Sequence, residues 1–454
     1  MTKKTQIKLL LFLLLFALAK VSFAQEVLDK YVRTGLDSNL AIRQQSFDLK
    51  KAKLDLDRAK ALFLPQVGVN AQYTLATGGR SIDVPLGNLL NDVYSSLNQL
   101  TSSSKFPQVE NQSIQFLPND FQDTKIELNV PIYNPALGYN KKIKEELINT
   151  QQLSLYQYKR ELVFNIKQAY FQYLQAFKAV DIYNNALNTV HESLRFNEKL
   201  VKNNTATKEV VLKAKAEVSK VETLLVNAEQ NKKNAAAYFN FLLNKPLESA
   251  IDIDTNMVRS LQQEVNVSLD LPSNREELQQ LKSSEKVLQT NLKLNDTYKL
   301  PVLNGFYNIG FQGYGYKFNN DQFYQLGGLQ LKWNIFSGND NKLKSKQAQI
   351  DIDAIQNSYN DIEKQLLLQV ATTYNTYQAS LKALHSSNDE VISNKEVFRL
   401  IQSRYTQGQA LQIELIDART EMTNAEIKYS LAQLSVLNKA AELERVMATY
   451  QLPK

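Results

Sequence analysis

The chain has 454 residues, and because it contains no cysteine and only two histidines, disulfide frameworks and thiol chemistry are excluded and metal sites or catalytic triads have little basis. Four of its 53 basic residues lie among the first 24 positions, so the formal charge of +7 falls to about +3 without them. The remaining bases are dispersed along the chain, and the sequence therefore does not indicate a nucleic-acid partner.

The N-terminal residues 1–24 have the pattern of a secretory signal peptide. Three lysines precede an apolar run at 9–19 and a small-residue site at 22–24. We expect cleavage after Ala24. The run of about 11 apolar residues is too short to span a bilayer as a helix, and no later stretch comes closer to that requirement. We therefore expect a mature chain without a transmembrane helix.

Glycine and proline are distributed very unevenly. Glycine is absent between Gly138 and Gly305, and proline is absent from 136–245 and from 302–452. Stretches that avoid both helix breakers for this long predict very long helices, at about 135–243 and 338–450. A helix of about 65 residues would be roughly 100 Å long, which exceeds what an ordinary globular domain needs.

Apolar residues in these stretches recur at alternating spacings of three and four, the pattern of a coiled-coil seam. Each stretch carries two such seams, which predicts a pair of helices folded back as a hairpin. An ordinary helical bundle would explain the seams but not the lengths. The clearest seams comprise Leu162, Ile166, Ala169, Tyr173 and Ala176, then Ala214, Val218, Val221, Leu225 and Ala228, then Leu415, Ala418, Met422, Ala425 and Tyr429.

In two windows rich in glycine and proline the apolar period changes to two, which predicts strands. The predicted strands are about ten residues long and carry one apolar face each, which suits a tilted membrane strand. A soluble two-faced hairpin would give the same pattern, so the periodicity alone leaves both alternatives open. The predicted strands cover about 64–77, 123–133, 301–315 and 324–336.

The two halves of the chain repeat each other. Leu64-Pro65 matches Leu300-Pro301, and Tyr170 matches Tyr374. We expect a first repeat of helix, strand, strand, helix and helix at 25–243 and a second at 276–454.

The segment 244–275 would join the repeats as a linker with short β-like runs at 250–254 and 265–271. The loop 78–122 of the first repeat is longer than its counterpart and rich in Ser, Asn and Gln. We place this loop outside the cell and assign it no ligand.

Four membrane strands cannot form a closed barrel, yet every strand edge inside lipid must be paired. A chain that inserts four strands must therefore complete its barrel with copies of itself. Three copies would give twelve strands above a set of long helices, whose polar outer faces require an aqueous compartment. The expected fold is mainly α with a membrane β-barrel part: a trimeric 12-stranded barrel continued by a long α-helical coiled-coil tunnel.

This organisation resembles the TolC-type outer-membrane efflux protein family across nearly the whole mature chain. The most specific matches are 404–408, which is similar to the family's tip turn, and the following helix at 413–419. The first repeat carries a weaker copy at 203–207, where Asn204 replaces the expected glycine. The signature at 64–67 adds support.

The resemblance implies an exit duct in the outer membrane of a Gram-negative bacterium, with its helices in the periplasm. It implies a passive homotrimer that serves tripartite efflux or type I secretion. Its partners would be outer-membrane lipid, a periplasmic adaptor (membrane fusion) protein and an inner-membrane pump of RND or ABC type. The nature of the cargo is not implied.

The resemblance also implies a periplasmic gate. Glu414 and Asp417 lie three residues apart on one helical face without a Lys or Arg at helical spacing, and they match the family's acidic constriction. Tyr405 matches a position that helps to hold the closed state, and Gly408 and Asn204 match the tip turns. The alternative for Glu414 and Asp417 is a solvated helix face, and the alternative for Tyr405 is a capping aromatic in a coiled-coil seam. Ala410 stands where some members carry a basic latch residue.

Polar residues of the predicted strands are candidates for the lumen. They are Lys125, Glu127, Asn129 and Lys332, which would line the pore if the apolar phase of each strand meets lipid. Solvated edge charges are the alternative. Aromatic residues of the strands would form interfacial belts, although aromatics are also common in strands generally. These aromatics are Tyr73, Tyr307, Phe311 and Trp333.

No motif for catalysis or cofactor binding is present. The sequence lacks a phosphate-binding loop, a dinucleotide-binding turn and a nucleophile elbow, and its two histidines lack paired carboxylates at metal-ligand spacing. We therefore expect neither an enzyme nor a cofactor, and the energy for transport must come from a partner. The alternative function is a soluble periplasmic coiled-coil adaptor or scaffold, which predicts soluble β domains instead of a detergent-requiring trimer.

Overall fold

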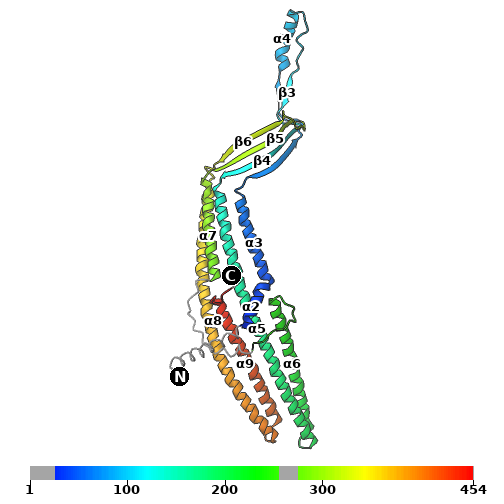
Figure 1. Cartoon of the computed structure of the whole chain (residues 1–454), viewed down its shortest axis with the longest axis vertical. Coiled ribbons are helices and arrows are strands. Elements are labelled where there is room, and N and C mark those ends of the chain that lie inside the picture. The colour runs from blue at the N-terminus through cyan, green and yellow to red at the C-terminus, as the bar shows by residue number, and fades with distance from the viewer. Residues whose placement is uncertain (1–25, 255–274, 453–454) are drawn as a thin grey trace, which may run out of the picture. The chain divides into compact units, whose positions relative to one another are not determined.

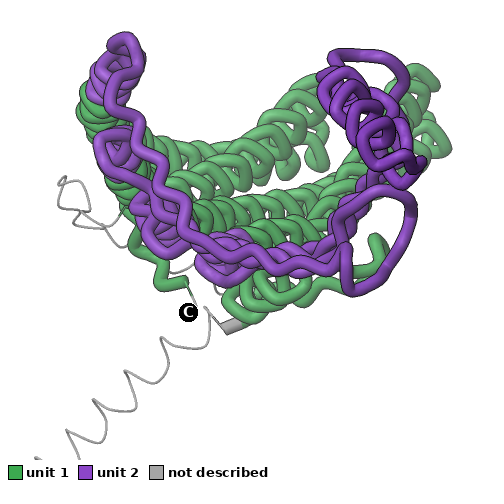
Figure 2. Tube along the Cα trace, turned by 90° about the horizontal axis from the view of Figure 1, so that it is seen from above, with its two compact units in different colours: residues 1–53, 146–287, 351–454 green, residues 54–145, 288–350 purple. Residues whose placement is uncertain are grey.

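The computed structural model describes residues 26–254 and 275–452, which divide into two compact units (Figure 2). Unit 1 comprises the described parts of residues 1–53, 146–287 and 351–454. Unit 2 comprises residues 54–145 and 288–350. The predicted signal peptide and the β-like run at 265–271 lie outside the described residues.

Unit 1 is built from helices, several of which have one end in unit 2 (Figure 1). In Figure 2 the helices of unit 1 follow an open curve. None of the helices in the described ranges is both long and apolar enough to cross a membrane. The helices are α2 (Glu26–Ser38), α3 (Leu40–Ala61), α5 (Pro135–Lys202), α6 (Lys208–Leu242), α7 (Glu276–Asp296), α8 (Asp340–Thr406) and α9 (Gln412–Val446).

The absence of glycine and proline explains the length of the two longest helices. α5 has 68 residues and α8 has 67. Pro135 is the first residue of α5, where a missing backbone N–H has no helical partner to lose. α5 packs beside α6 and α8 beside α9, as two hairpins (Figure 1). The predicted mainly helical fold class is confirmed.

Alanine-rich seams hold these hairpins together. Ala179 and Val180 of α5 pack against Ala228 of α6, and Ile427 of α9 contacts the same cluster. Small side chains allow the helix axes to approach closely, so α9 can lie against the first hairpin as well as against α8. The two hairpins of the chain are therefore packed together along this part of unit 1.

The largest apolar cluster of unit 1 joins α2, α3, α5, α6 and α9. Tyr31 and Tyr170 lie at its centre, and burial raises the pKa of Tyr170 to about 12. The Tyr170 hydroxyl donates to the Asp252 carbonyl at 3.0 Å and accepts from the Asp254 N–H at 3.1 Å. The Asp252 N–H donates to the Tyr31 hydroxyl at 2.8 Å. The β-like run predicted at 250–254 is therefore not a strand, because tyrosine hydroxyls satisfy its backbone.

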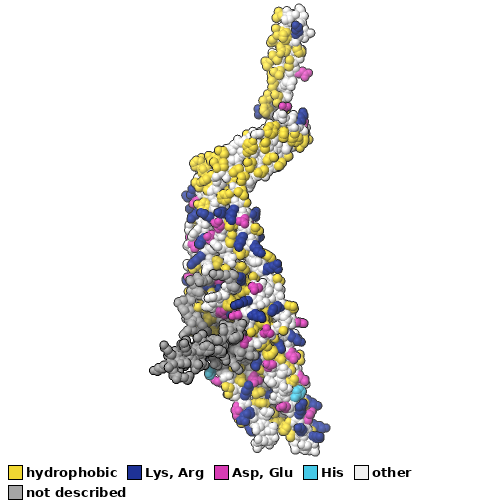
Figure 3. Space-filling view, viewed as in Figure 1, with side chains coloured by type: hydrophobic (Ala, Val, Ile, Leu, Met, Phe, Trp, Pro, Cys, Tyr) yellow, Lys and Arg dark blue, Asp and Glu magenta, His cyan; other side chains and the backbone are white. Residues whose placement is uncertain are grey.

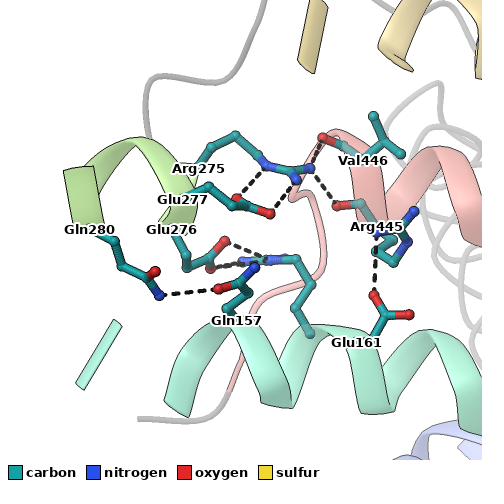
Figure 4. A network of polar contacts seen from close by, with 9 residues as sticks. Gln157, Glu161, Arg275, Glu276, Glu277, Gln280, Arg445 and Val446 are labelled. Carbon is teal, nitrogen blue, oxygen red and sulfur yellow. Dashed lines mark hydrogen bonds and ion pairs between the residues drawn. The ribbon is translucent and has the colours of Figure 1, made fainter. Parts of the chain in front are cut away.

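Buried arginines join the start of α7 to the end of α9 and the middle of α5 (Figure 4). Arg275 donates to the Arg445 carbonyl at 3.2 Å and to the Val446 carbonyl, and pairs with Glu277 at 2.7 Å. A guanidinium placed here satisfies carbonyls that a helix C-terminus leaves unpaired. Arg160 of α5 binds Glu276 through both carboxylate oxygens, with a shortest distance of 2.6 Å.

Unit 2 contains a four-stranded sheet within its described residues, with the order β1-β4-β5-β6. Each neighbouring pair is antiparallel, so β1 and β6 are the edges. The strands are β1 (Gln66–Thr74), β4 (Phe121–Tyr133), β5 (Val302–Tyr314) and β6 (Phe323–Lys332).

The last strand is shorter than the sequence predicts. β6 was expected over about 324–336 but ends at Lys332, which pairs with Val302. Val302 is the first residue of β5, so β6 has no partner strand beyond this point. Trp333 lies outside the strand, and its indole N–H donates to the Lys299 carbonyl at 3.2 Å.

One face of the sheet is apolar and exposed to solvent. It carries Val69, which is 77% exposed, and Leu329, which is 69% exposed. Figure 3 shows apolar side chains gathered over the sheet. A water-soluble sheet would bury such a face against another layer, whereas a face of this kind suits lipid.

The long loop between β1 and β4 is folded, which the sequence analysis did not anticipate. It contains β2 (Ser81–Val84), α4 (Leu86–Leu100) and β3 (Gln112–Gln115). β2 and β3 pair as an antiparallel ribbon. Because Thr74 and Phe121 are register partners, this arm (residues 75–120) extends from the end of the sheet where β1 finishes.

Candidate functional site at the hairpin tips

The two hairpin tips in unit 1 share one turn geometry. In the first, the Asn204 N–H donates to the Val201 carbonyl and the Thr205 N–H donates to the Leu200 carbonyl at 2.9 Å. In the second, the Gly408 N–H donates to the Tyr405 carbonyl and the Gln409 N–H donates to the Arg404 carbonyl at 2.8 Å. Both arrangements are Schellman motifs, which pair the last carbonyls of a helix.

The residue at the centre of each turn adopts a left-handed conformation. Gly408 has φ +74° and Asn204 has φ +55°. Glycine adopts this region without steric cost, and asparagine is among the few other residues that do so readily. The structure therefore places both predicted tip residues in equivalent turns and shows how Asn204 substitutes for glycine.

Close to the tips, Tyr405 of α8 reaches across to α5. Its side chain is buried, and its hydroxyl donates to Oδ1 of the Asn197 side chain. Its ring also contacts Phe196 edge-on, with centroids 5.7 Å apart. Burial raises the pKa of the Tyr405 phenol, so it remains a neutral donor at physiological pH. The predicted gate residue Tyr405 thus joins the two hairpins.

α9 makes two polar contacts with α6 in the same region. Arg419 forms an ion pair with Glu217, and both side chains are largely buried, at 7% and 12% exposure. Burial lowers the pKa of Arg419 and the Glu217 carboxylate opposes that shift. The Gln412 side chain donates to the Val210 carbonyl at 2.8 Å. The interface between the hairpins is therefore polar at the tips.

Several polar atoms of this interface have no hydrogen-bond partner among the described residues. They are Asn197 Nδ2, Gln412 Oε1 and Arg419 Nε. A cavity of about 210 Å³ lies between the four helices beside them. An unpaired buried polar group costs about 1–3 kcal/mol, so this part of the interface is weaker than the alanine-rich seams further along the helices.

The predicted acidic pair lies at the start of α9. The Glu414 carboxylate accepts from the Leu411 N–H at 3.3 Å, which places a negative charge at a helix N-terminus, where it is stabilised. Asp417 is exposed. Among the described residues no Lys or Arg forms an ion pair with either side chain. In one copy of the chain, therefore, the two carboxylates lack a cationic partner and Asp417 faces solvent.

Known proteins are similar to this chain in part of its length or over almost all of it. The model of a family described as "Outer membrane efflux protein" matches residues 269–449, a range that includes the second hairpin tip. The second half of the chain is therefore similar to members of the outer membrane efflux protein family. Two proteins named "Outer membrane protein TolC" are similar to it over almost the whole length. The relative from Escherichia coli (strain K12) is 20% identical over 98% of this chain and 87% of its own, and that from Salmonella enteritidis is 20% identical over 96% and 86%.

Solved structures of membrane channels share the fold. The CmeC outer membrane channel of Campylobacter jejuni matches with a TM-score of 0.71 and 13% identity, covering 93% of this chain and 85% of its own. The open state of the MtrE channel of Neisseria gonorrhoeae matches with a TM-score of 0.69 and 15% identity, covering 93% and 88%. CusC matches with a TM-score of 0.74 and 12% identity, covering 93% and 92%.

The hairpin contacts at Asn197, Glu217 and Arg419 were missed when only the sequence was considered. The partners in each contact lie about 200 positions apart in the sequence, so no short-range residue spacing indicates that they meet. A partial signal was present, because Arg419 has Leu415, Ile416 and Met422 at helical spacing and no acid three or four residues away. A basic residue on such an apolar face of a long helix indicates an ion pair with another helix.

The predicted lumen residues lie on one face of the sheet. Lys125 pairs with Asp123 at 2.8 Å and with Glu127 at 3.4 Å, on the same side of β4. Asn129 shares this face by the two-residue period. Lys332 of β6 follows the parity of Tyr324, which donates to Asp123 at 3.0 Å. Asp123 was not among the predicted residues, although it occupies the same phase.

Three of the four predicted belt aromatics, Tyr73, Tyr307 and Phe311, lie on the apolar face of the sheet by the strand register. Tyr73 and Tyr307 lie on the exposed apolar face, and Tyr73 donates to Asp120 beyond the end of β1. Phe311 packs edge-on against Phe323 with centroids 5.7 Å apart. Trp333 lies beyond the end of β6. An interfacial role for these residues remains a prediction.

Proposed function

We propose that this protein is the outer-membrane channel of a tripartite efflux or type I secretion system in a Gram-negative bacterium. The family match, the TolC relatives and the fold shared with solved membrane channels support this function. The protein acts as a passive homotrimeric conduit with its helical part in the periplasm. A gate at the hairpin tips controls passage.

The sheet of unit 2 carries this proposal. Its four strands have 9, 13, 13 and 10 residues, close to the roughly 9–11 residues that cross a bilayer when tilted. One face is apolar and exposed, and β1 and β6 are edges without partners within the described chain. Lipid would cover the face, but it cannot pair the edges.

Identical copies pair those edges with the correct polarity. Directions alternate across the sheet, so β6 of one copy runs antiparallel to β1 of the next. A ring of three copies then forms a twelve-stranded closed barrel in which every strand has antiparallel neighbours. Asp123, Lys125 and Glu127 face the lumen in this arrangement, because the apolar face meets lipid.

The tips of α5–α6 and α8–α9 supply the gate. In a threefold-symmetric trimer, the three copies of Glu414 form one ring of carboxylates and the three copies of Asp417 form another. Each ring attracts cations, and the carboxylates within a ring repel one another. The polar contacts of Tyr405 and Arg419 hold neighbouring hairpins together in the closed state. Three polar atoms at this interface have no hydrogen-bond partner among the described residues, so they add nothing to the free energy that holds the hairpins together. Separating the hairpins at their tips therefore requires only the free energy of the contacts made by Tyr405, Gln412 and Arg419.

Energy and selectivity come from partners. The sequence contains no nucleotide-binding motif, so an inner-membrane pump of RND or ABC type drives transport through a periplasmic adaptor. The alternative function, a soluble periplasmic adaptor or scaffold, has no support from the relatives, which are channels.

Two experiments test the proposal. Purified protein added to a planar bilayer should produce discrete conductance steps, and deletion of the gene should increase the susceptibility of cells to pump substrates. Controls are detergent alone and the complemented deletion strain. A protein that produces no conductance and whose loss affects neither efflux nor secretion does not have this function.

A further inference from the structure

The arm between β1 and β4 contains a helix whose apolar side is not used within its own chain. Leu86, Leu89, Val93, Ser96 and Leu100 of α4 follow spacings of three and four residues, the a and d positions of a coiled coil. Leu89 is 64% exposed, Val93 52% and Leu100 82%. Figure 3 shows apolar side chains along this arm, with few charged groups among them.

The polar side of α4 is the side that packs against its own chain. Asn91 forms two hydrogen bonds with the backbone of Val109, at 3.0 and 2.8 Å, and Asn98 forms two with the backbone of Phe106, at 2.7 and 3.0 Å. Tyr94 also stacks against Phe106, with centroids 5.8 Å apart. The segment that follows α4 in the arm therefore lies opposite the apolar seam and leaves it uncovered.

These contacts fix the helix without covering its apolar side. A 15-residue helix is marginal in water by itself, so the Asn91 and Asn98 clamps stabilise it and set its orientation. A surface helix normally turns its apolar stripe toward its own core. The reversed orientation of α4 indicates that the partner for the seam comes from outside the chain.

The assembly described under the proposed function, on which this inference rests, supplies that partner. Every copy of the chain extends one arm from the same end of the barrel, so three identical seams surround one axis. α4 contains no Lys or Arg and a single acid, Asp92. Three copies therefore repel each other little, and the helix lacks the cations that an anionic lipid partner would require.

We propose that the three α4 helices of a trimer pack through Leu86, Leu89, Val93, Ser96 and Leu100 into a short three-helix coiled coil. This bundle caps the outer mouth of the barrel. Val93 occupies an a position and Leu89 a d position, a combination of β-branched and leucine side chains that is common in parallel coiled coils. Ser96, at a d position, limits the stability of the cap.

Cysteine cross-linking tests the cap directly, because the native chain contains no cysteine. Val93→Cys and Leu100→Cys place single thiols in the seam. Lys105→Cys is the matched control, because this exposed residue lies in the segment that follows α4 in the same arm. Each variant is oxidised in detergent after light scattering has established its oligomeric state.

Trimeric Val93→Cys and Leu100→Cys should form disulfide-linked dimers at least tenfold faster than trimeric Lys105→Cys, reaching at most two thirds of the chains because each trimer has an odd third thiol. Trimers in which neither seam variant cross-links faster than the control would overturn the cap and leave the proposed channel intact. If the unsubstituted protein is monomeric in detergent, both the cap and the channel are wrong.

Discussion

Single residues at the hairpin tips determine how firmly the closed interface is held. Tyr405 and Arg419 each make one polar contact between the hairpins, and neighbouring polar atoms have no hydrogen-bond partner among the described residues. The sequence could indicate Tyr405, because it precedes a turn glycine in a recognisable motif. It could not indicate Asn197 or Glu217, because their partners belong to the other hairpin and tertiary packing alone brings them together.

Tyr405→Phe should loosen the closed tip. The substitution keeps the ring packing but removes the hydroxyl, which leaves Oδ1 of the Asn197 side chain without this donor. The lost contact amounts to about 1–3 kcal/mol, so the open probability in planar bilayers should rise severalfold. Tyr238→Phe is the control, because this α6 side chain is 50% exposed. Equal open probabilities for the two variants would show that the hydroxyl does not restrain the gate.

Arg419→Met should open the tip more strongly than Tyr405→Phe. It leaves the largely buried Glu217 carboxylate without its cation, at a cost of about 3–5 kcal/mol. The double variant Arg419→Met with Glu217→Gln removes that uncompensated charge and should recover much of the closed state. The same bilayer recordings decide the matter. A double variant as leaky as the single one contradicts an ion-pair latch.

At the scale of elements, the positions of glycine and proline predict the helices well. α5 and α8 span the stretches without helix breakers, and the strands begin where the apolar period changes to two. The arm could not be predicted, because α4 is short and its asparagine side chains form hydrogen bonds with the segment that follows it instead of with water. The end of β6 was also missed, because it depends on where β5 begins.

The turn geometry predicts different tolerances at the two tips. Asn204→Gly should leave the first hairpin unchanged, because glycine accepts the left-handed conformation without strain. Gly408→Val should destabilise the second tip by about 1–2 kcal/mol, since a β-branched residue fits that region poorly. Hydrogen exchange at the tip amides measures both effects. Faster exchange in Asn204→Gly than in Gly408→Val would contradict the turn assignments.

At the scale of the whole molecule, the proposed acidic rings of Glu414 and Asp417 require the assembled trimer. The double variant Glu414→Gln with Asp417→Asn removes six charges per trimer and preserves the helix cap, because the glutamine oxygen can still accept from Leu411. Cation selectivity should fall, and block by a trivalent cation from the periplasmic side should weaken about tenfold. Glu421→Gln, an exposed acid of the same helix, is the control. Unchanged block in the double variant removes both residues from the constriction.

We infer that one chain supplies only four strands of a closed β-barrel and that identical copies supply the others. Light scattering on the detergent-solubilised protein measures the number of chains per particle most directly. The account predicts three chains, in a particle that separates into single chains only on heating in denaturing detergent. A single chain that stays dispersed in water without detergent would contradict it.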